Sequence, residues 1–310
     1  MTERETITGT PNKAARTPGS QIIGLIRTMR PKQWVKNGFI FVPLFFDRKL
    51  FDLPYLLDTL LGFILFSLVS STVYLINDLV DMEADRAHPK KQSRPLPSGQ
   101  LSRGLATAAA IVIPLAALPL SFLLNPAFAA IAASYLVLQL LYTFWLKQIA
   151  ILDVMSIAAG FVLRVAAGVV LVDVVRFSPW LYLFTTMLAL FLGFAKRRQE
   201  LILLEEGANN HRISLDQYNI ALLDEMIVIV TAVTVLTYSL YTFSAEGLPP
   251  NHSMMLTIPF VLYGIFRYLH LIHVKGETAP PDEIALRDRP LQVAIFLWVL
   301  MVIAVLYVFG

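Results

Sequence analysis

The chain has 310 residues, of which 56% are hydrophobic and only 15% are charged, and it carries a net charge of +3 and no cysteine. Soluble domains contain roughly 45–50% apolar and about 25% charged residues, so this composition excludes an ordinary soluble globular protein. It predicts a polytopic membrane protein without disulfides or thiol chemistry, and we expect no nucleic-acid partner.

The N-terminal region differs from the rest of the chain. Residues 1–20 are polar and lack the apolar core of a signal peptide, so we expect a disordered cytoplasmic tail. The segment IIGLIRTMR, residues 22–30, is typical of an amphipathic helix at a membrane surface.

Apolar stretches long enough to cross a bilayer recur along the remaining chain. A crossing helix needs about 20 apolar residues, so we expect residues 21–310 to form a single all-α domain, a bundle of nine transmembrane helices. The expected spans lie near 33–46, 55–79, 104–124, 126–146, 150–172, 179–199, 221–243, 253–274 and 291–309.

Lysine and arginine are distributed unevenly between the two ends of these spans. With the N-terminus in the cytoplasm, 20 of the 25 basic residues fall on the cytoplasmic side and three on the opposite side. Because basic residues favour cytoplasmic loops, we expect a cytoplasmic N-terminus and, after nine spans, an external C-terminus at the cell membrane.

The second expected span runs into a charged segment, NDLVDMEADRAHPKKQSR, residues 77–94. Asn77, Asp81 and Asp85 would share one face if the helix continued, and Asp78 lies beside them. Oxygen ligands in this density are typical of a Mg²⁺ site that substrate phosphates complete. A solvated helix end with paired charges is the alternative, but acids that begin inside an apolar span favour a function.

Basic residues follow the acids at once and are suited to the remaining phosphate charge. Those that we expect to bind substrate here are Arg86, Lys90 and Arg94. The charged segment faces the cytoplasm in the expected topology, so its substrate would come from that side.

The chain resembles the UbiA superfamily of intramembrane prenyltransferases, whose N-D-x-x-D-x-x-x-D motif is matched by NDLVDMEAD at residues 77–85. Four further segments are similar to the decaprenyl-phosphate phosphoribosyltransferase branch: RPKQWVKN, DVMSIAAGFVLRVAAG, AKRRQEL and PDEIALRDRPLQ. The resemblance implies a nine-helix bundle with a cytoplasm-facing cavity and a Mg²⁺-diphosphate site.

This branch implies transfer of 5-phosphoribose from phosphoribosyl diphosphate to a membrane polyprenyl phosphate, in the synthesis of a cell-wall arabinan precursor. The implied catalytic residues are Asn77, Asp81 and Asp85, and the implied Mg²⁺ ligands are these three and Asp78. Membrane lipids would surround the enzyme, and an oligomer is compatible with the sequence.

One segment departs from the superfamily, which usually carries a second aspartate-rich motif after the sixth helix. Residues 194–219 read FAKRRQELILLEEGANNHRISLDQYN, with Lys196, Arg197 and Arg198 in the prominent place. We expect Lys196 and Arg197 to bind a substrate monophosphate and Arg198 to anchor the helix end. For all three, a positive-inside anchor is the alternative.

Four further residues are candidates for substrate binding. Lys36 lies close to Trp34, where an interfacial aromatic and basic belt is an equal alternative. Tyr142 and Lys147 end the fourth span and could reach the ribose or its phosphate. Arg164 lies deep inside the fifth span, where an arginine needs a partner, so it either pairs with a neighbouring helix or lines the cavity.

Two other functions remain open. The first is an ordinary prenyltransferase of the same superfamily, which moves an isoprenoid from its diphosphate to an aromatic or lipid acceptor; the missing second aspartate motif argues against it. The second is a transporter of phosphorylated metabolites, but the sequence shows neither a repeat nor the interrupted helices typical of transporters.

Overall fold

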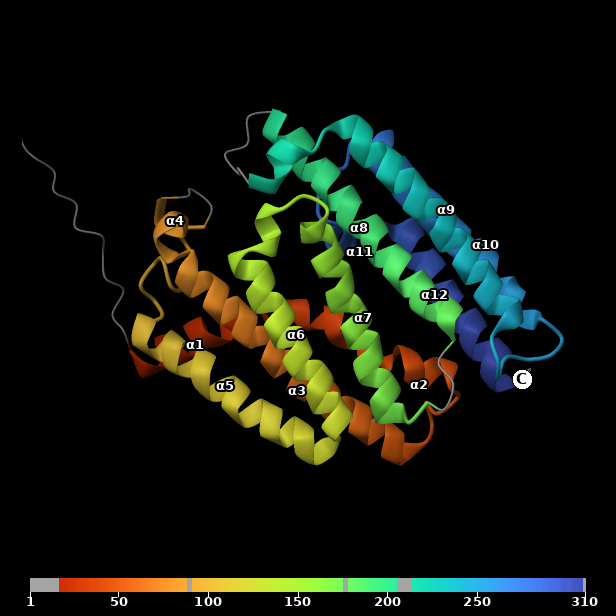
Figure 1. Ribbon diagram of the computed structural model, residues 1–310, viewed down its shortest axis with the longest axis horizontal. Coiled ribbons are helices and arrows are strands. Elements are labelled where there is room, and N and C mark those ends of the chain that lie inside the picture. Colours follow the sequence, from red (N-terminus) through yellow and green to blue (C-terminus); the bar gives the residue numbers. More distant parts are fainter. Residues whose placement is uncertain (1–16, 88–90, 175–177, 206–212, 309–310) are drawn as a thin grey trace, which may run out of the picture. The chain divides into compact units, whose positions relative to one another are not determined.

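The computed structural model describes residues 17–87, 91–174, 178–205 and 213–308 (Figure 1). Every regular element in this part of the chain is a helix, which confirms the all-α membrane fold. The α-helices are α1 Pro18–Met29, α2 Val42–Phe46, α3 Leu53–Val80, α4 Met82–Ala87, α5 Arg103–Leu124, α6 Pro126–Phe144, α7 Leu152–Val172, α8 Pro179–Glu205, α9 Ile220–Ser244, α10 Ile258–His273, α11 Pro281–Arg287 and α12 Arg289–Ile303.

Shorter helices connect or extend these elements. The 3₁₀ helices are η1 Pro31–Phe41, η2 Leu146–Gln148, η3 Ile213–Gln217 and η4 Ser253–Thr257, and the chain continues after α12 as a π-helical turn, η5 Ala304–Val308. Helix α1 begins at Pro18 with Thr17 as its N-cap, so residues 17–20, which we expected in the tail, belong to the start of this helix.

Eight helices in the described residues are long and apolar enough to cross a membrane. They correspond to the expected spans from the second to the ninth, and the chain is a multi-pass membrane protein. The first expected span, near 33–46, is instead made of η1 and α2. A 3₁₀ helix rises about 2.0 Å per residue, so these two elements together still extend about 30 Å, close to the hydrocarbon thickness.

Side-chain caps explain where several helices begin. Asn125 accepts hydrogen bonds from the backbone N–H groups of Ala127 and Phe128 at the start of α6, and Asp288 accepts one from Leu291 at the start of α12. The first N–H groups of a helix have no partner inside it, so an asparagine or aspartate side chain there fixes the start of the helix.

The chain divides into two compact units. Unit 1 comprises residues 1–35 and 66–119, and unit 2 comprises residues 36–65 and 120–310. In unit 1, α1, the second part of α3, α4 and α5 enclose a small apolar core, in which Met82, Leu96 and Leu101 are buried. In unit 2, α8 and α9 lie side by side along most of their length (Figure 1), and their core includes Phe191, Leu223 and Tyr268.

Helix α7 is held at close range by its neighbours in unit 2. A Cβ atom on Gly168 would lie 2.0 Å from the carbonyl oxygen of Ile40, and one on Gly193 would lie 2.5 Å from Cγ1 of Val154. Small residues let membrane helices approach to backbone distance. These contacts therefore fix α7 against η1 on one side and against α8 on the other, and they set the positions of the polar side chains on α7.

Candidate functional site

The acidic motif lies at the end of a membrane span, where the helix is interrupted. Helix α3 ends at Val80 and α4 begins at Met82, with Asp81 in a bend between them. Backbone hydrogen bonds from Asp81 to Asn77 (2.9 Å) and from Asp85 to Asp81 (2.8 Å) nevertheless continue across the bend, so Asn77, Asp81 and Asp85 stay on successive turns. The two deeply buried acids are Asp78 and Asp85, each 3% exposed; they are seven residues apart, so about two helical turns place them on the same side of the helix.

Asp78 and Asp85 share one cationic partner in unit 1. Nη1 of Arg94 lies 2.6 Å from Oδ2 of Asp85 and 3.4 Å from Oδ1 of Asp78. Nη2 of Arg30, at the end of α1, donates a hydrogen bond of 2.6 Å to the same oxygen of Asp78. Lys91 approaches Asp85 at 3.8 Å. Buried carboxylates are usually paired, and these three cations are the partners of Asp78 and Asp85.

The arrangement of the two carboxylates fits a divalent cation. Both already contact one positive group, the guanidinium of Arg94, and Asn77 and Asp81 offer further oxygen atoms on adjacent turns. Within the described ranges, no three His, Cys, Asp or Glu side chains gather closely enough to form a metal cage by themselves. Mg²⁺ is usually held by one or two carboxylates together with substrate phosphates and water, so two converging acids meet that requirement.

The other basic residues of this segment are placed differently from Arg94. Nη1 of Arg86 pairs with Oε1 of Glu83 at 2.9 Å, and both side chains are largely exposed, 49% and 74%. Exposed pairs of this kind contribute little to stability, so the Arg86 guanidinium is available to a ligand at small cost. Lys90 lies outside the described residues.

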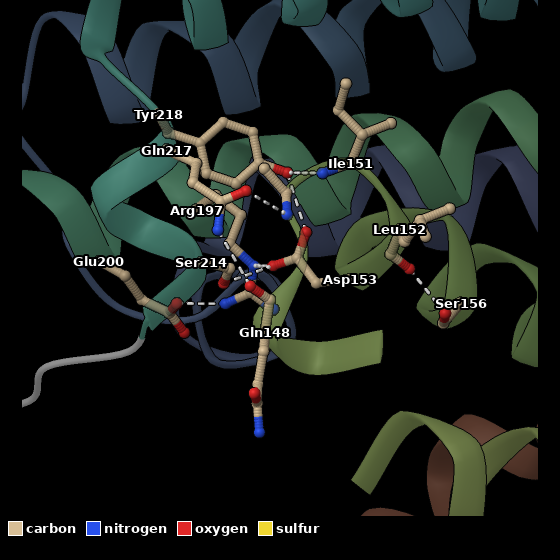
Figure 2. A network of polar contacts seen from close by, with 11 residues as sticks. Gln148, Ile151, Leu152, Asp153, Ser156, Arg197, Glu200, Ser214, Gln217 and Tyr218 are labelled. Carbon is tan, nitrogen blue, oxygen red and sulfur yellow. Dashed lines mark hydrogen bonds and ion pairs between the residues drawn. The ribbon is translucent and has the colours of Figure 1, made fainter. Parts of the chain in front are cut away.

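A second polar cluster lies in unit 2, around Asp153 in the first turn of α7 (Figure 2). The Asp153 side chain is completely buried. It accepts hydrogen bonds from the hydroxyl groups of Tyr218 at 2.8 Å and Ser214 at 3.2 Å, and its Oδ2 lies 2.8 Å from Nε of Arg197. The sequence did not predict this residue, since an acid one position into an apolar span is also typical of an ordinary helix start.

Arg197, expected to bind a phosphate, is itself buried in this cluster, with 1% of its side chain exposed. Its guanidinium lies between Asp153 and Glu200, and both carboxylates form ion pairs with it (Figure 2). Two acids offset one guanidinium, so the cluster has no excess positive charge for an anion. This geometry is typical of a residue that holds neighbouring elements in position.

Tyr218 connects the cluster to the turn before α7. Its hydroxyl group accepts a hydrogen bond from the backbone N–H of Ile151 and donates one to Asp153. Burial raises the pKa of Tyr218 above its ordinary value, and the neighbouring carboxylate of Asp153 raises it further. The phenol therefore stays protonated at neutral pH and remains a donor to Asp153.

Residues predicted from the ends of α6 and α8 lie near this cluster. Tyr142 is half-buried and within electrostatic range of Arg197, and Lys147 is half-buried in η2. The next residue, Gln148, accepts a hydrogen bond of 3.1 Å on its carbonyl oxygen from the side chain of Gln217 (Figure 2). Lys196 is also half-buried and directly precedes Arg197 on α8.

Arg198, expected to be an anchor, forms an ion pair with Asp224 of α9, with 2.5 Å between Nε and Oδ1. Arg164 is buried in α7 and donates hydrogen bonds to Oδ1 of Asn37 at 2.8 Å and to the hydroxyl of Tyr135 at 2.9 Å. These contacts favour the structural one of its two expected roles. Lys36, next to Asn37 in the chain, is half-buried.

Trp34 has a partner inside the protein. Its Nε1 donates a hydrogen bond of 3.0 Å to Oγ of Ser71 on α3. The indole is half-buried and anchors the start of η1 on α3 within unit 1. This bond accounts for the tryptophan without an interfacial belt at that position.

Known proteins resemble this chain over most of its length. Decaprenyl-phosphate phosphoribosyltransferase of Corynebacterium glutamicum is 33% identical over 306 residues, which cover 96% of this chain and 91% of the relative. The protein of the same name from Mycolicibacterium smegmatis is 34% identical over 306 residues, with 94% of each chain covered.

The same fold is found among solved structures. A UbiA homologue from Archaeoglobus fulgidus bound to GPP and Mg²⁺ superposes with a TM-score of 0.68 at 19% identity, over 92% of this chain and all of the other. The sequence model of the UbiA prenyltransferase family matches residues 39–281. These matches agree with the acidic motif and the helical bundle, and the chain belongs to the UbiA prenyltransferase family.

Proposed function

We propose that this protein transfers 5-phosphoribose from phosphoribosyl diphosphate to a polyprenyl phosphate in the membrane and releases diphosphate. The observation that carries the proposal is the convergence of Asp78 and Asp85 on one cationic position at the end of a membrane span. The choice of donor and acceptor rests on the relatives, which are named decaprenyl-phosphate phosphoribosyltransferase.

Asp78, Asp85 and the adjacent Asn77 and Asp81 would hold Mg²⁺ on the diphosphate of the donor. Once bound, the metal would neutralise the charge that develops on the departing diphosphate. Arg94 and Arg86 lie next to these acids and would meet the remaining phosphate oxygens, and we also keep Lys90 as a candidate for this role. The lipid phosphate is already an anion at neutral pH, so the chain needs no strong general base, and attack opposite the leaving group gives inversion.

We assign the substrate monophosphates to polar side chains at the ends of α6 and α8, beside the second cluster. Lys196, Tyr142 and Lys147 are the half-buried polar side chains there, and we assign phosphate or ribose contacts to them. Arg197 is paired with two carboxylates, and we now assign it the role of holding α7 and α8 together. Lys36 and Arg164 remain candidate contacts to substrate, with Arg164 acting through Asn37 and Tyr135.

An ordinary prenyltransferase is the second candidate, favoured by the fold that this chain shares with a homologue solved with GPP and Mg²⁺. Incubation of the purified protein with Mg²⁺, polyprenyl phosphate and labelled phosphoribosyl diphosphate separates the two functions. We expect a labelled phosphoribosyl lipid by mass spectrometry. If only a prenyl diphosphate donor is consumed, in a parallel incubation with an aromatic acceptor, the phosphoribosyltransferase proposal fails.

Topology is part of the proposal, because phosphoribosyl diphosphate is a cytoplasmic metabolite. We propose that the acidic motif faces the cytoplasm and that the C-terminus lies outside the cell membrane, as the distribution of basic residues favours. Reporter fusions within residues 91–102 and after Gly310 measure both sides directly. A cytoplasmic C-terminal reporter would mean that η1 and α2 do not cross the membrane.

A further inference from the structure

Helix α1 has two different faces. Gly24 and Thr28 are buried, and a Cβ atom on Gly24 would lie 3.3 Å from Cβ of Leu101, so this face packs on the rest of unit 1. On the opposite face Ile22, Ile23 and Ile26 are 56%, 50% and 50% exposed. With 3.6 residues per turn, the three isoleucines fall within an arc of about 100°, which makes a continuous apolar stripe.

This stripe belongs to a helix that cannot cross the bilayer. Helix α1 has 12 residues and is therefore about 18 Å long, well short of the roughly 30 Å of hydrocarbon. Among the described residues of unit 1, no other segment covers the stripe. Three adjacent exposed isoleucines on a short helix mark a surface that interacts with something.

The attachment points of α1 fix its depth in the membrane. Oγ of Ser71 lies 3.1 Å from the carbonyl oxygen of Met29, and Arg30 is bonded to Asp78. Ser71 and Asp78 lie within the last turns of α3, which ends at Val80, so the end of α1 is held at most about 14 Å along the axis from the end of a span. The hydrocarbon gives way to head groups at this level.

The occupant that fits this surface is the bilayer itself. The spans of the same unit already present apolar side chains to lipid, such as Ile111 and Leu115, which are 54% and 68% exposed. Arg27 is exposed beside the isoleucines, where a cation can reach lipid phosphates from the edge of an apolar stripe.

We propose that α1 lies in the plane of the membrane with Ile22, Ile23 and Ile26 in the boundary between head groups and acyl chains, and that this contact with lipid holds Arg30 against Asp78. Arg30 directly follows α1, so its backbone moves with that helix, while its guanidinium also lies 4.9 Å from the centre of the Tyr74 ring on α3. A shift of α1 along or away from the lipid therefore moves the guanidinium from the acidic motif. The membrane surface therefore helps to hold Arg30 at the acidic motif.

The depth of α1 can be measured without any assay of activity. The chain has no cysteine, so single-cysteine variants at Ile22 and Ile26 take one fluorophore each in lipid nanodiscs. Matched positions in the same unit are Ser98, exposed in a polar turn, and Ile111, exposed on the α5 span. We expect the labels at Ile22 and Ile26 to be quenched by lipid-borne nitroxide, as at Ile111, and protected from iodide, unlike Ser98.

Two outcomes would overturn the proposal. Quenching of both labels by iodide, as at Ser98, would place the stripe in water. Protection from both quenchers would mean that protein rather than lipid covers it, as expected for a helix packed on a second copy or another chain.

The link between the lipid contact and the position of α1 has its own test. A Gly24→Cys, Leu101→Cys pair would place two Cβ atoms close to the spacing of about 3.8 Å found in disulfides, so it reports the docked helix. We expect Ile22→Asp with Ile26→Asp to slow disulfide formation several-fold in nanodiscs, and Ser98→Asp to leave it unchanged. An unchanged rate in the double aspartate variant would show that lipid does not hold α1 in place.

Discussion

Asp153 and Arg197 form an ion pair that is closed to solvent, with 2.8 Å between Oδ2 and Nε and exposed fractions of 0% and 1%. The pair joins the start of α7 to the end of α8, and it is supported by Tyr218 and Ser214 from the segment that follows α8. A buried pair of this kind costs desolvation on both sides, and losing one partner leaves the other charge unpaired.

We therefore predict that Asp153→Asn and Arg197→Gln each lower the free energy of unfolding by about 3–5 kcal/mol, and that the double variant loses less than the sum. Thermal unfolding of the detergent-purified variants, followed by circular dichroism, measures this. If Arg197→Gln were as stable as the wild type and yet lost donor affinity, Arg197 would be a phosphate ligand and the positioning role would be wrong.

We expect turnover to depend on the buried carboxylates of the acidic motif. Asp85→Asn removes one of the two carboxylates that meet Arg94, and we expect turnover to fall by about two to three orders of magnitude while the protein still folds. Glu83→Gln is the matched control, since it makes the same chemical change on α4 at a side chain that is 74% exposed. Equal activity of both variants would remove Asp85 from the metal site.

Arg94 and Arg86 provide a second matched pair. Arg94 contacts both buried carboxylates, whereas Arg86 pairs with exposed Glu83. Losing a buried charged partner costs roughly 2–5 kcal/mol, so Arg94→Ala should weaken Mg²⁺-dependent donor binding by at least tens of fold. Isothermal titration with the donor measures the change. We expect Arg86→Ala to lose less donor affinity, because Arg86 could contribute only through direct contact with the donor. A larger loss in Arg86→Ala than in Arg94→Ala would contradict this assignment.

We expect the carboxyl group of Asp288 to make the stability of the protein depend on pH. It caps α12 at Leu291 and accepts two hydrogen bonds from Arg267, which hold the pKa of the carboxyl below its ordinary value. The stabilisation is present above the unfolded-state pKa of about 3.9 and is lost as the pH falls through the lower folded-state pKa. Asp288→Ala should cost about 0.5–2 kcal/mol at neutral pH.

Asp288→Asn is the control for that prediction, because asparagine also caps helices but does not titrate. Thermal unfolding at pH 7 and at pH 3 should show the cap retained in the asparagine variant and the acid-induced loss reduced. An unchanged acid response in Asp288→Asn would assign that response to other carboxyl groups.

The approach of η1 to α7 can be tested with two glycines. Gly168→Ala would place a Cβ 2.0 Å from the Ile40 carbonyl oxygen, so backbone must move, at a cost of about 1–3 kcal/mol. Gly38→Ala adds the same methyl group on η1, where no atom lies within 4 Å. We expect Gly168→Ala to lower the melting temperature and Gly38→Ala to leave it unchanged. Equal melting temperatures of the two variants would contradict the close contact between η1 and α7.

The spans could be predicted from the sequence because each is a long run of apolar residues, and length together with apolar composition identifies a helix that can cross the bilayer. The first span could not be assigned in the same way. Its run near 33–46 is short and is broken by polar residues, and only the structure shows an extended 3₁₀ helix there. The acidic motif was also recognisable, since Asp78 already lies within apolar sequence.

The pairing of the motif could not be predicted. Arg30 lies 48 positions from Asp78, and Asp153 lies 44 positions from Arg197, so sequence spacing gives no sign of either contact. Arg197 was expected to bind substrate because basic residues stand where the superfamily usually has aspartates. The acids that offset its charge come from α7 and from the next turn of α8.

Arg30 combines two properties that usually exclude each other. Its backbone ends α1 in the left-handed region, with φ 54° and ψ 60°. Glycine adopts this conformation without strain, whereas a residue with a side chain loses about 1–2 kcal/mol there. The same residue supplies the guanidinium that meets Asp78, which glycine cannot do. At this position the backbone conformation therefore favours glycine, whereas the ion pair with Asp78 requires arginine. A screen for stability alone would tend to select glycine at this position, and a screen for catalysis would select arginine.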